Sequence, residues 1–151
     1  MKTKRQYAVI LSISLALSLA ACSGTPPTDL GIQGDGLKPC PDTPNCVSSL
    51  APVKDDTHFI PALSADEGSD LEGLWSRLPD GLKRQEIRIV EVTDTYLRAE
   101  AMTQLMRFVD DLEFYKDRAK DVIQVRSASR LGRSDFGKNR ERIEQLRADL
   151  R

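Results

Sequence analysis

Four strand-like runs follow one another between residues 85 and 129, and only a few polar residues separate each run from the next. The runs cover residues 85–92, 95–102, 107–115 and 122–129. Parallel neighbours need a crossover of about a dozen residues or more, so links this short favour antiparallel hairpins. We therefore expect an antiparallel sheet of these four runs, to which a short stretch at residues 57–63 can add a fifth strand.

An amphipathic segment precedes the runs. Residues 65–78 carry apolar side chains at helical spacing, and Ser64 and Glu67 stand in capping-box positions in front of them. The sequence Pro79-Asp80-Gly81 is a stop signal, so we expect the helix to end at residue 78.

A second helix is expected at residues 135–150, capped by Ser134. Its buried side is marked by Phe136, Ile143, Leu146 and Leu150. Helix, four strands and helix together predict an α+β fold. In this fold an antiparallel sheet of four to five strands forms two layers with two helices packed on one face.

The first 21 residues have the pattern of a signal peptide. Basic residues at Lys2, Lys4 and Arg5 precede an apolar stretch of about 15 residues, which ends at Ala21. A membrane-spanning helix needs ~20 apolar residues, so this stretch is too short for a permanent span. We expect residues 1–21 to be removed on export.

The signal segment ends in Leu19-Ala20-Ala21-Cys22, which resembles the lipobox of bacterial lipoproteins. The resemblance implies a lipid on Cys22, and two or more acyl chains make membrane anchoring stable. Ser23 stands where lipoproteins retained in the inner membrane resemble one another in carrying Asp, so the outer membrane facing the periplasm is favoured over the inner membrane. The competing interpretation is an ordinary signal peptide that ends in a cysteine.

The mature chain is expected to have two parts. Residues 22–36 are rich in Gly and Pro and predict a flexible tether, and residues 37–151 form a single α+β domain. Without the signal segment, 19 basic residues remain against 23 acidic ones, a net charge of about −4. This charge offers no electrostatic reason to bind nucleic acid.

Two cysteines remain after lipidation, and Cys40 and Cys46 enclose five residues that favour turns. We expect a structural disulfide in an oxidising compartment. A redox-active pair would have two intervening residues, and a zinc site would need more ligands than the single histidine, His58, supplies.

Polar residues interrupt the last two runs. Strand alternation places Asp110 on the inner face with Leu112, together with Ser127 and Ser129, whose hydroxyls can donate to its carboxylate. Asp111 then lies on the outer face, where Arg126 can form a cross-strand pair with an acidic neighbour.

Two interpretations of this polar cluster stay open. In the structural one, Asp110 and the segment after residue 126 join the last strand to the last helix. In the functional one, cationic and amide side chains converge at the helix N-terminus and bind an anion, against which Asp135 argues. The residues for this anion site are Arg126, Arg130, Arg133, Asn139 and Arg140.

No residue set qualifies as a catalytic centre, and the sequence predicts no cofactor and no metal site. The leading hypothesis is a non-catalytic envelope module that binds a small or lipid-like ligand or an envelope protein. The alternatives are a hydrolase or transferase that uses Asp110 with the arginine cluster, and a structural assembly factor of the envelope.

Three segments resemble the family catalogued as domain of unknown function 1499. They read CPDTPNCVSS at residues 40–49, FVDD at residues 108–111 and RSASRLGRSDFGKNR at residues 126–140. The resemblance covers nearly all of residues 37–151 and implies a small exported or membrane-associated domain. It implies no activity, substrate or catalytic residue.

Overall fold

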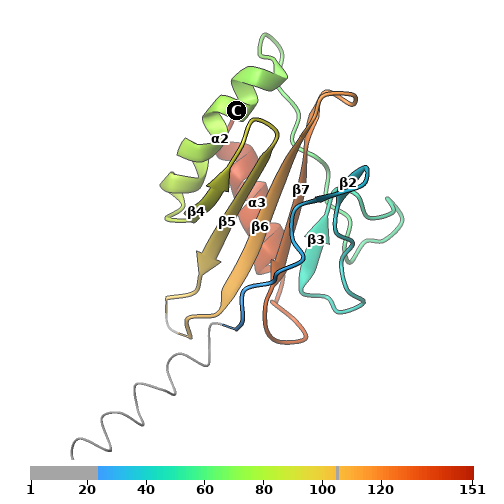
Figure 1. The fold of residues 1–151 in the computed structure, drawn as a ribbon, viewed down its shortest axis with the longest axis vertical. Helices are drawn as coiled ribbons and strands as arrows, with labels where there is room; N and C mark the ends of the chain where they lie inside the picture. Colours follow the sequence, from blue (N-terminus) through green and yellow to red (C-terminus); the bar gives the residue numbers. More distant parts are fainter. Residues whose placement is uncertain (1–23, 105) are drawn as a thin grey trace, which may run out of the picture.

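Five antiparallel strands form the main sheet of the protein in the order β3-β7-β6-β5-β4 (Figure 1). The computed structural model describes residues 24–104 and 106–151. The strands are β3 (Cys46–Ser48), β4 (Arg88–Val92), β5 (Tyr96–Met102), β6 (Val109–Asp117) and β7 (Val122–Ser129). The α+β class and the four antiparallel runs are confirmed. The fifth strand is β3, whereas residues 57–63 contribute only isolated bridges at Phe59 and Leu63.

Helix α2 (Leu71–Arg84) begins and ends about six residues later than expected. Asp70 is its N-cap, and the Asp70 Oδ1 atom accepts a hydrogen bond of 2.7 Å from the Gly73 amide. The predicted Ser64 cap and the stop at Pro79 were wrong. The apolar stripe continues to Leu82, which is fully buried, so tertiary burial carries the helix past the proline.

Helix α3 (Lys138–Asp149) begins three residues later than expected, after Gly137 in a left-handed conformation. The predicted Ser134 cap was wrong, because the Asp135 carboxylate accepts the Asn139 amide at 2.7 Å instead. Phe136, expected on the buried side, is 94% exposed, because its turn precedes the helix and directs it away from the core. The burial of Ile143, Leu146 and Leu150 is confirmed.

One core joins both helices to alternate residues of the strands. On β6 the inward residues Leu112 and Phe114 are fully buried in the same cluster as Leu78 of α2 and Leu146 of α3. We call this face of the sheet the inner face, and the face that carries Asp111 the outer face.

Residues 24–37, which we call the N-terminal segment, cross the outer face over β6 and β7 (Figure 1). This segment contains the small sheet β1 (Ile32–Gln33) and β2 (Gly36–Leu37), and the Gly31 amide donates to Glu113 on β6 at 2.8 Å. The expectation of a flexible tether therefore does not hold for residues 24–36. The high Gly and Pro content predicts flexibility, whereas the hydrogen bond from the Gly31 amide ties this stretch to the sheet.

The disulfide between Cys40 and Cys46 is confirmed, with the two Cα atoms 5.7 Å apart. Cys46 begins β3, so the bridge ties the chain after the N-terminal segment to the sheet edge.

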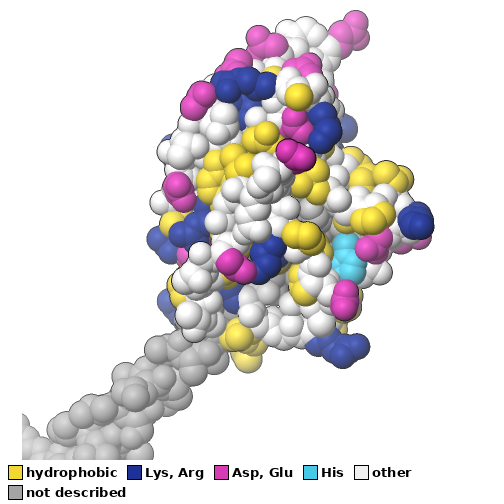
Figure 2. Space-filling model, turned by 45° about the vertical axis from the view of Figure 1, so that its right-hand side comes forward, with side chains coloured by type: hydrophobic (Ala, Val, Ile, Leu, Met, Phe, Trp, Pro, Cys, Tyr) yellow, Lys and Arg dark blue, Asp and Glu magenta, His cyan; other side chains and the backbone are white. Residues whose placement is uncertain are grey.

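Figure 2 shows acidic and basic side chains interspersed on one face of the molecule. Neither helix in the described part of the chain has the length and hydrophobicity that a membrane crossing requires.

Replacement of Pro79 by Ala should stabilise the protein. Pro79 lies inside α2 and cannot donate to the carbonyl four residues earlier, a loss that costs a helix interior ~3 kcal/mol. Part of the gain is offset because the unfolded chain becomes more flexible. We expect Pro79→Ala to raise the free energy of unfolding by about 1–2 kcal/mol in urea titrations. Ser76→Ala, at an exposed position of the same helix, should change it by a few tenths of a kcal/mol; a lower stability of Pro79→Ala would contradict the prediction.

Candidate functional site

The Asp110 carboxylate lies on the inner face, 4% exposed, and both of its oxygens are bonded. Its Oδ1 atom accepts from the Ser129 hydroxyl at 2.5 Å, and its Oδ2 atom accepts from the Arg142 guanidinium at 2.7 Å. The predicted inward position and the serine partner are confirmed. Asp110 is thus held by α3 and β7, and each of its oxygens accepts a hydrogen bond within the domain.

Asn139, at the start of α3, is fully buried beside Asp110 and joins three segments. Its side-chain amide donates to the Asn45 carbonyl at 3.2 Å and to the Asp135 carboxylate at 2.8 Å. Its carbonyl oxygen accepts from the Ser127 hydroxyl at 2.5 Å. These bonds support the structural interpretation of the cluster, because they connect β7 to α3.

The outer face carries a second set of buried charges. Arg130 forms a two-pronged pair with Asp111, with both N–O distances at 2.7 Å, and also reaches Glu100 at 2.6 Å. Burial raises the pKa of Glu100, but the hydrogen bonds from Arg130 and Arg88 outweigh it and leave this pKa below its usual value. Asp111 and Arg130 are therefore an internal ion pair of the sheet.

Next to this set, the Glu113 carboxylate is fully buried and accepts hydrogen bonds from three donors. Arg126 of β7 reaches it at 3.2 Å, the Tyr96 hydroxyl at 2.9 Å and the Gly31 amide at 2.8 Å. Burial, together with the Glu113 charge, raises the pKa of Tyr96, so its phenol stays protonated. The cross-strand pair expected for Arg126 is confirmed, although it is buried.

The arginines of the proposed anion site do not converge. Arg126 and Arg130 point to the outer face, and Arg140 donates to the backbone carbonyls of Asp56 and Thr57. Arg133 is exposed in the loop before α3. Strand alternation explains the error, because even-numbered residues of β7 lie on the face opposite α3.

Arg142, the cation that does meet Asp110, is not among the residues predicted from the sequence. Arg142 follows Asn139 by three residues, so both lie on one side of α3, and its Nη1 atom donates to the Asn139 side chain at 3.1 Å. This spacing was the available signal for finding it.

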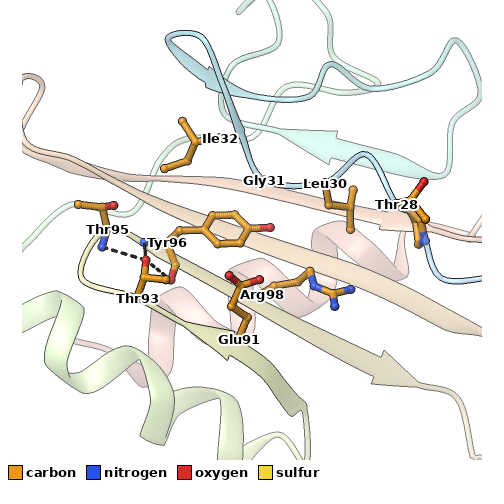
Figure 3. Close-up of a pocket in the computed structure, with 10 residues that line it drawn as sticks. Thr28, Leu30, Gly31, Ile32, Glu91, Thr93, Thr95, Tyr96 and Arg98 are labelled. Atoms are coloured by element: carbon orange, nitrogen blue, oxygen red, sulfur yellow. Dashed lines mark hydrogen bonds between the residues drawn. The ribbon is translucent and has the colours of Figure 1, made fainter.

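A hollow of about 390 Å³ opens on the outer face between the N-terminal segment and the hairpin of β4 and β5 (Figure 3). We call it the hairpin hollow. One wall comes from the N-terminal segment and the other from the hairpin. Its lining residues are Pro27, Thr28, Leu30, Gly31, Ile32, Glu91, Thr93, Thr95, Tyr96 and Arg98.

Four polar side chains of the hairpin hollow are available to a ligand. The Arg98 guanidinium forms no hydrogen bond within the described chain, and its nearest carboxylate oxygens, on Asp111 and Glu100, are 3.8 and 3.9 Å away. The hydroxyls of Thr28 and Thr95 and the carboxylate of Glu91 likewise form no hydrogen bond with other described residues. Thr93, in contrast, is used within its own turn, where its hydroxyl accepts the Tyr96 amide at 2.9 Å.

The single histidine lines a second hollow, of about 210 Å³, near the disulfide. The Nδ1 atom of His58 lies 2.8 Å from the Asp55 carboxylate and its Nε2 atom 3.3 Å from the Thr43 carbonyl. The hydrogen bond from His58 lowers the pKa of Asp55. Because both ring nitrogens face protein oxygens, His58 has the role of a packing residue.

Within residues 24–104 and 106–151, no group of three His, Cys, Asp or Glu side chains is arranged to hold a metal ion.

The family model described as "Protein of unknown function (DUF1499)" matches residues 36–150. The chain belongs to this family. The family match begins at β2, so most of the N-terminal segment precedes it, as does one wall of the hairpin hollow. No curated protein and no solved structure matches the chain.

Replacement of Asp110 by Ala should lower stability, because it leaves the Arg142 guanidinium and the Ser129 hydroxyl without their partner. Loss of one member of a buried pair costs ~3–5 kcal/mol, and the partial exposure of Arg142, at 15%, reduces this to about 2–3 kcal/mol. Urea unfolding of Asp110→Ala measures the loss, and Asp56→Ala, at an exposed carboxylate, is the control. Similar stability of the two variants would contradict the structural role.

Proposed function

We propose that this protein is a lipid-anchored protein of the bacterial cell envelope that binds a small polar ligand without transforming it. The observation that carries the proposal is the hairpin hollow, which Arg98 lines without a hydrogen-bond partner in the described chain. Its volume, about 390 Å³, lies within the range of small-molecule sites, ~300–1,000 Å³.

The chemistry of the lining defines the ligand class. Arg98 offers a planar fork that suits a carboxylate or phosphate group. Glu91 suits an amine or hydroxyl of the same ligand, and the hydroxyls of Thr28 and Thr95 can donate or accept. A ligand with one anionic group and further hydrogen-bonding groups fits this set better than an acyl chain does, since these polar groups would be left unpaired against a hydrocarbon.

In this proposal the domain has two layers. Helices α2 and α3 cover the inner face, and the outer face is left to the N-terminal segment and the ligand. The shared core of Leu78, Phe114 and Leu146 supports this arrangement. A hydrolase or transferase would need Asp110 and Arg130 in one open cleft, whereas their partners lie on opposite faces of the sheet.

The lipid in this proposal is carried by Cys22, on the outer membrane facing the periplasm. The Cys40–Cys46 disulfide supports an oxidising compartment. Gly24, two residues after Cys22, lies against Leu131, so the proposed anchor joins the folded domain with almost no intervening chain.

Replacement of Arg98 by Gln should weaken ligand binding. The probes are inorganic phosphate, acetate, succinate and glutamate, titrated calorimetrically into the purified lipoprotein in detergent. A hydrogen bond to a charged group contributes ~1.5–3 kcal/mol, so we expect Arg98→Gln to weaken binding about 10- to 100-fold. Arg133→Gln, a change of the same type outside the hollow, should bind as the wild type does. Binding of none of the probes, or equal binding by both variants, would contradict the proposal.

Replacement of Cys22 by Ala should release the protein from membranes, because the acyl chains have no attachment site. Fractionation of cells into membrane and soluble parts measures the change, and mass spectrometry of the wild type identifies the lipid. Cys40→Ala removes the disulfide and keeps Cys22, so this control should remain in the membrane fraction. An unprocessed Met1 terminus on the wild-type protein would refute the anchor.

A further inference from the structure

Exposed apolar side chains gather at one end of the sheet, where β5 ends, β6 begins and β7 ends. The register places Met102 opposite Val109, and the Arg130 amide donates to the Val109 carbonyl at 3.0 Å, so the loops at this end are neighbours. We call this region the loop end, defined by the exposed side chains of Met102, Met106, Phe108, Leu131 and Phe136. Figure 1 shows both loops at the lower end of the sheet, and Figure 2 shows hydrophobic side chains there.

The most exposed of these side chains is held outward by a built turn. Phe136 has a φ of 54°, which large side chains rarely adopt. The Ser134 hydroxyl accepts the Phe136 amide at 3.2 Å, and the Asp135 carboxylate accepts the Gly137 amide at 3.0 Å. These two local hydrogen bonds therefore stabilise a turn in which the aromatic ring of Phe136 is 94% exposed.

The described chain begins at this same end. A Cβ placed on Gly24 would lie 3.0 Å from the Arg130 Cβ atom and 3.1 Å from the Leu131 Cγ atom. Cys22 is two residues earlier, and two residues span at most ~7 Å. Acyl chains on Cys22 would thus enter a bilayer within that distance of the loop end.

The charges of the loop end suit a lipid surface. Arg107 and Arg133 are exposed there, and neither forms an ion pair with another described residue. The carboxylate of Asp135 is occupied by backbone amides, and Lys138 pairs with Glu141. Two uncompensated guanidiniums beside apolar side chains match the boundary between anionic head groups and acyl chains.

We propose that the loop end is a membrane-docking surface that inserts Phe136, Met106 and Leu131 into the head-group region of the bilayer. This docking fixes the orientation of the domain, with its sheet end toward the membrane. This docking surface rests on the lipid proposed for Cys22 and does not depend on ligand binding in the hairpin hollow.

The test uses the lipidated protein reconstituted in vesicles of phosphatidylethanolamine and phosphatidylglycerol at a 3:1 ratio. Phe136→Cys is labelled with a polarity-sensitive fluorophore, and quenching by a lipid that carries a spin label near its head group is measured. Val92→Cys is the matched control, because Val92 is 53% exposed and pairs with Leu97 at the opposite end of the sheet. Met106→Cys is a second probe of the loop end should Phe136→Cys fold poorly.

We expect at least threefold stronger quenching at residues 136 and 106 than at residue 92. Equal quenching at both ends, or quenching at neither, overturns the proposal. Shielding of the loop-end label from aqueous iodide without lipid quenching also overturns it, since it identifies a protein as the occupant. Mass spectrometry of the same sample shows separately whether Cys22 carries the lipid. The absence of docking can therefore be distinguished from the absence of the anchor.

Discussion

Buried charges on the central strand β6 are the constraint on which the rest of the structure depends. A charge removed from water is costly unless it is paired and hydrogen-bonded, so each one requires a partner from another element. Asp110 obtains Arg142 from α3, and Lys116 obtains Glu72 from α2 at 2.8 Å. On the other face Glu113 draws in the N-terminal segment through the Gly31 amide. The partners of one strand thereby position both helices and the N-terminal segment.

This arrangement separates the polar groups that maintain the fold from those that remain for binding. Asp110, Asp111, Arg126 and Arg130 look like site residues by type, yet each is paired inside the domain. Side chains without a hydrogen-bond partner among the described residues lie elsewhere, at Arg98 in the hairpin hollow and at Arg107 and Arg133 of the loop end. Binding of a ligand or a membrane through these side chains leaves the hydrogen-bonded ion pairs of the sheet undisturbed.

Local patterns predicted the sheet well and the helix limits poorly. The strand runs were found because alternation and short polar links are properties of adjacent residues, and β7 matches its expected bounds, residues 122–129. The limits of α2 were missed because Ser64 and Pro79 are strong local signals that tertiary burial overrode. Residues 24–36 resemble a tether in sequence, since a bond such as that from Gly31 to Glu113 joins distant residues and has no local sequence pattern.

The sequence by itself determined the strand order along the chain, the inward position of Asp110 and the pairing of Cys40 with Cys46. Each follows from spacing over a few residues, where backbone geometry leaves little choice. Only the tertiary structure decided that Arg142 neutralises Asp110, that Arg130 points away from α3, and that the N-terminal segment forms a wall of the hairpin hollow. These depend on which distant segments meet, and that is decided by how the whole chain satisfies its buried polar groups together.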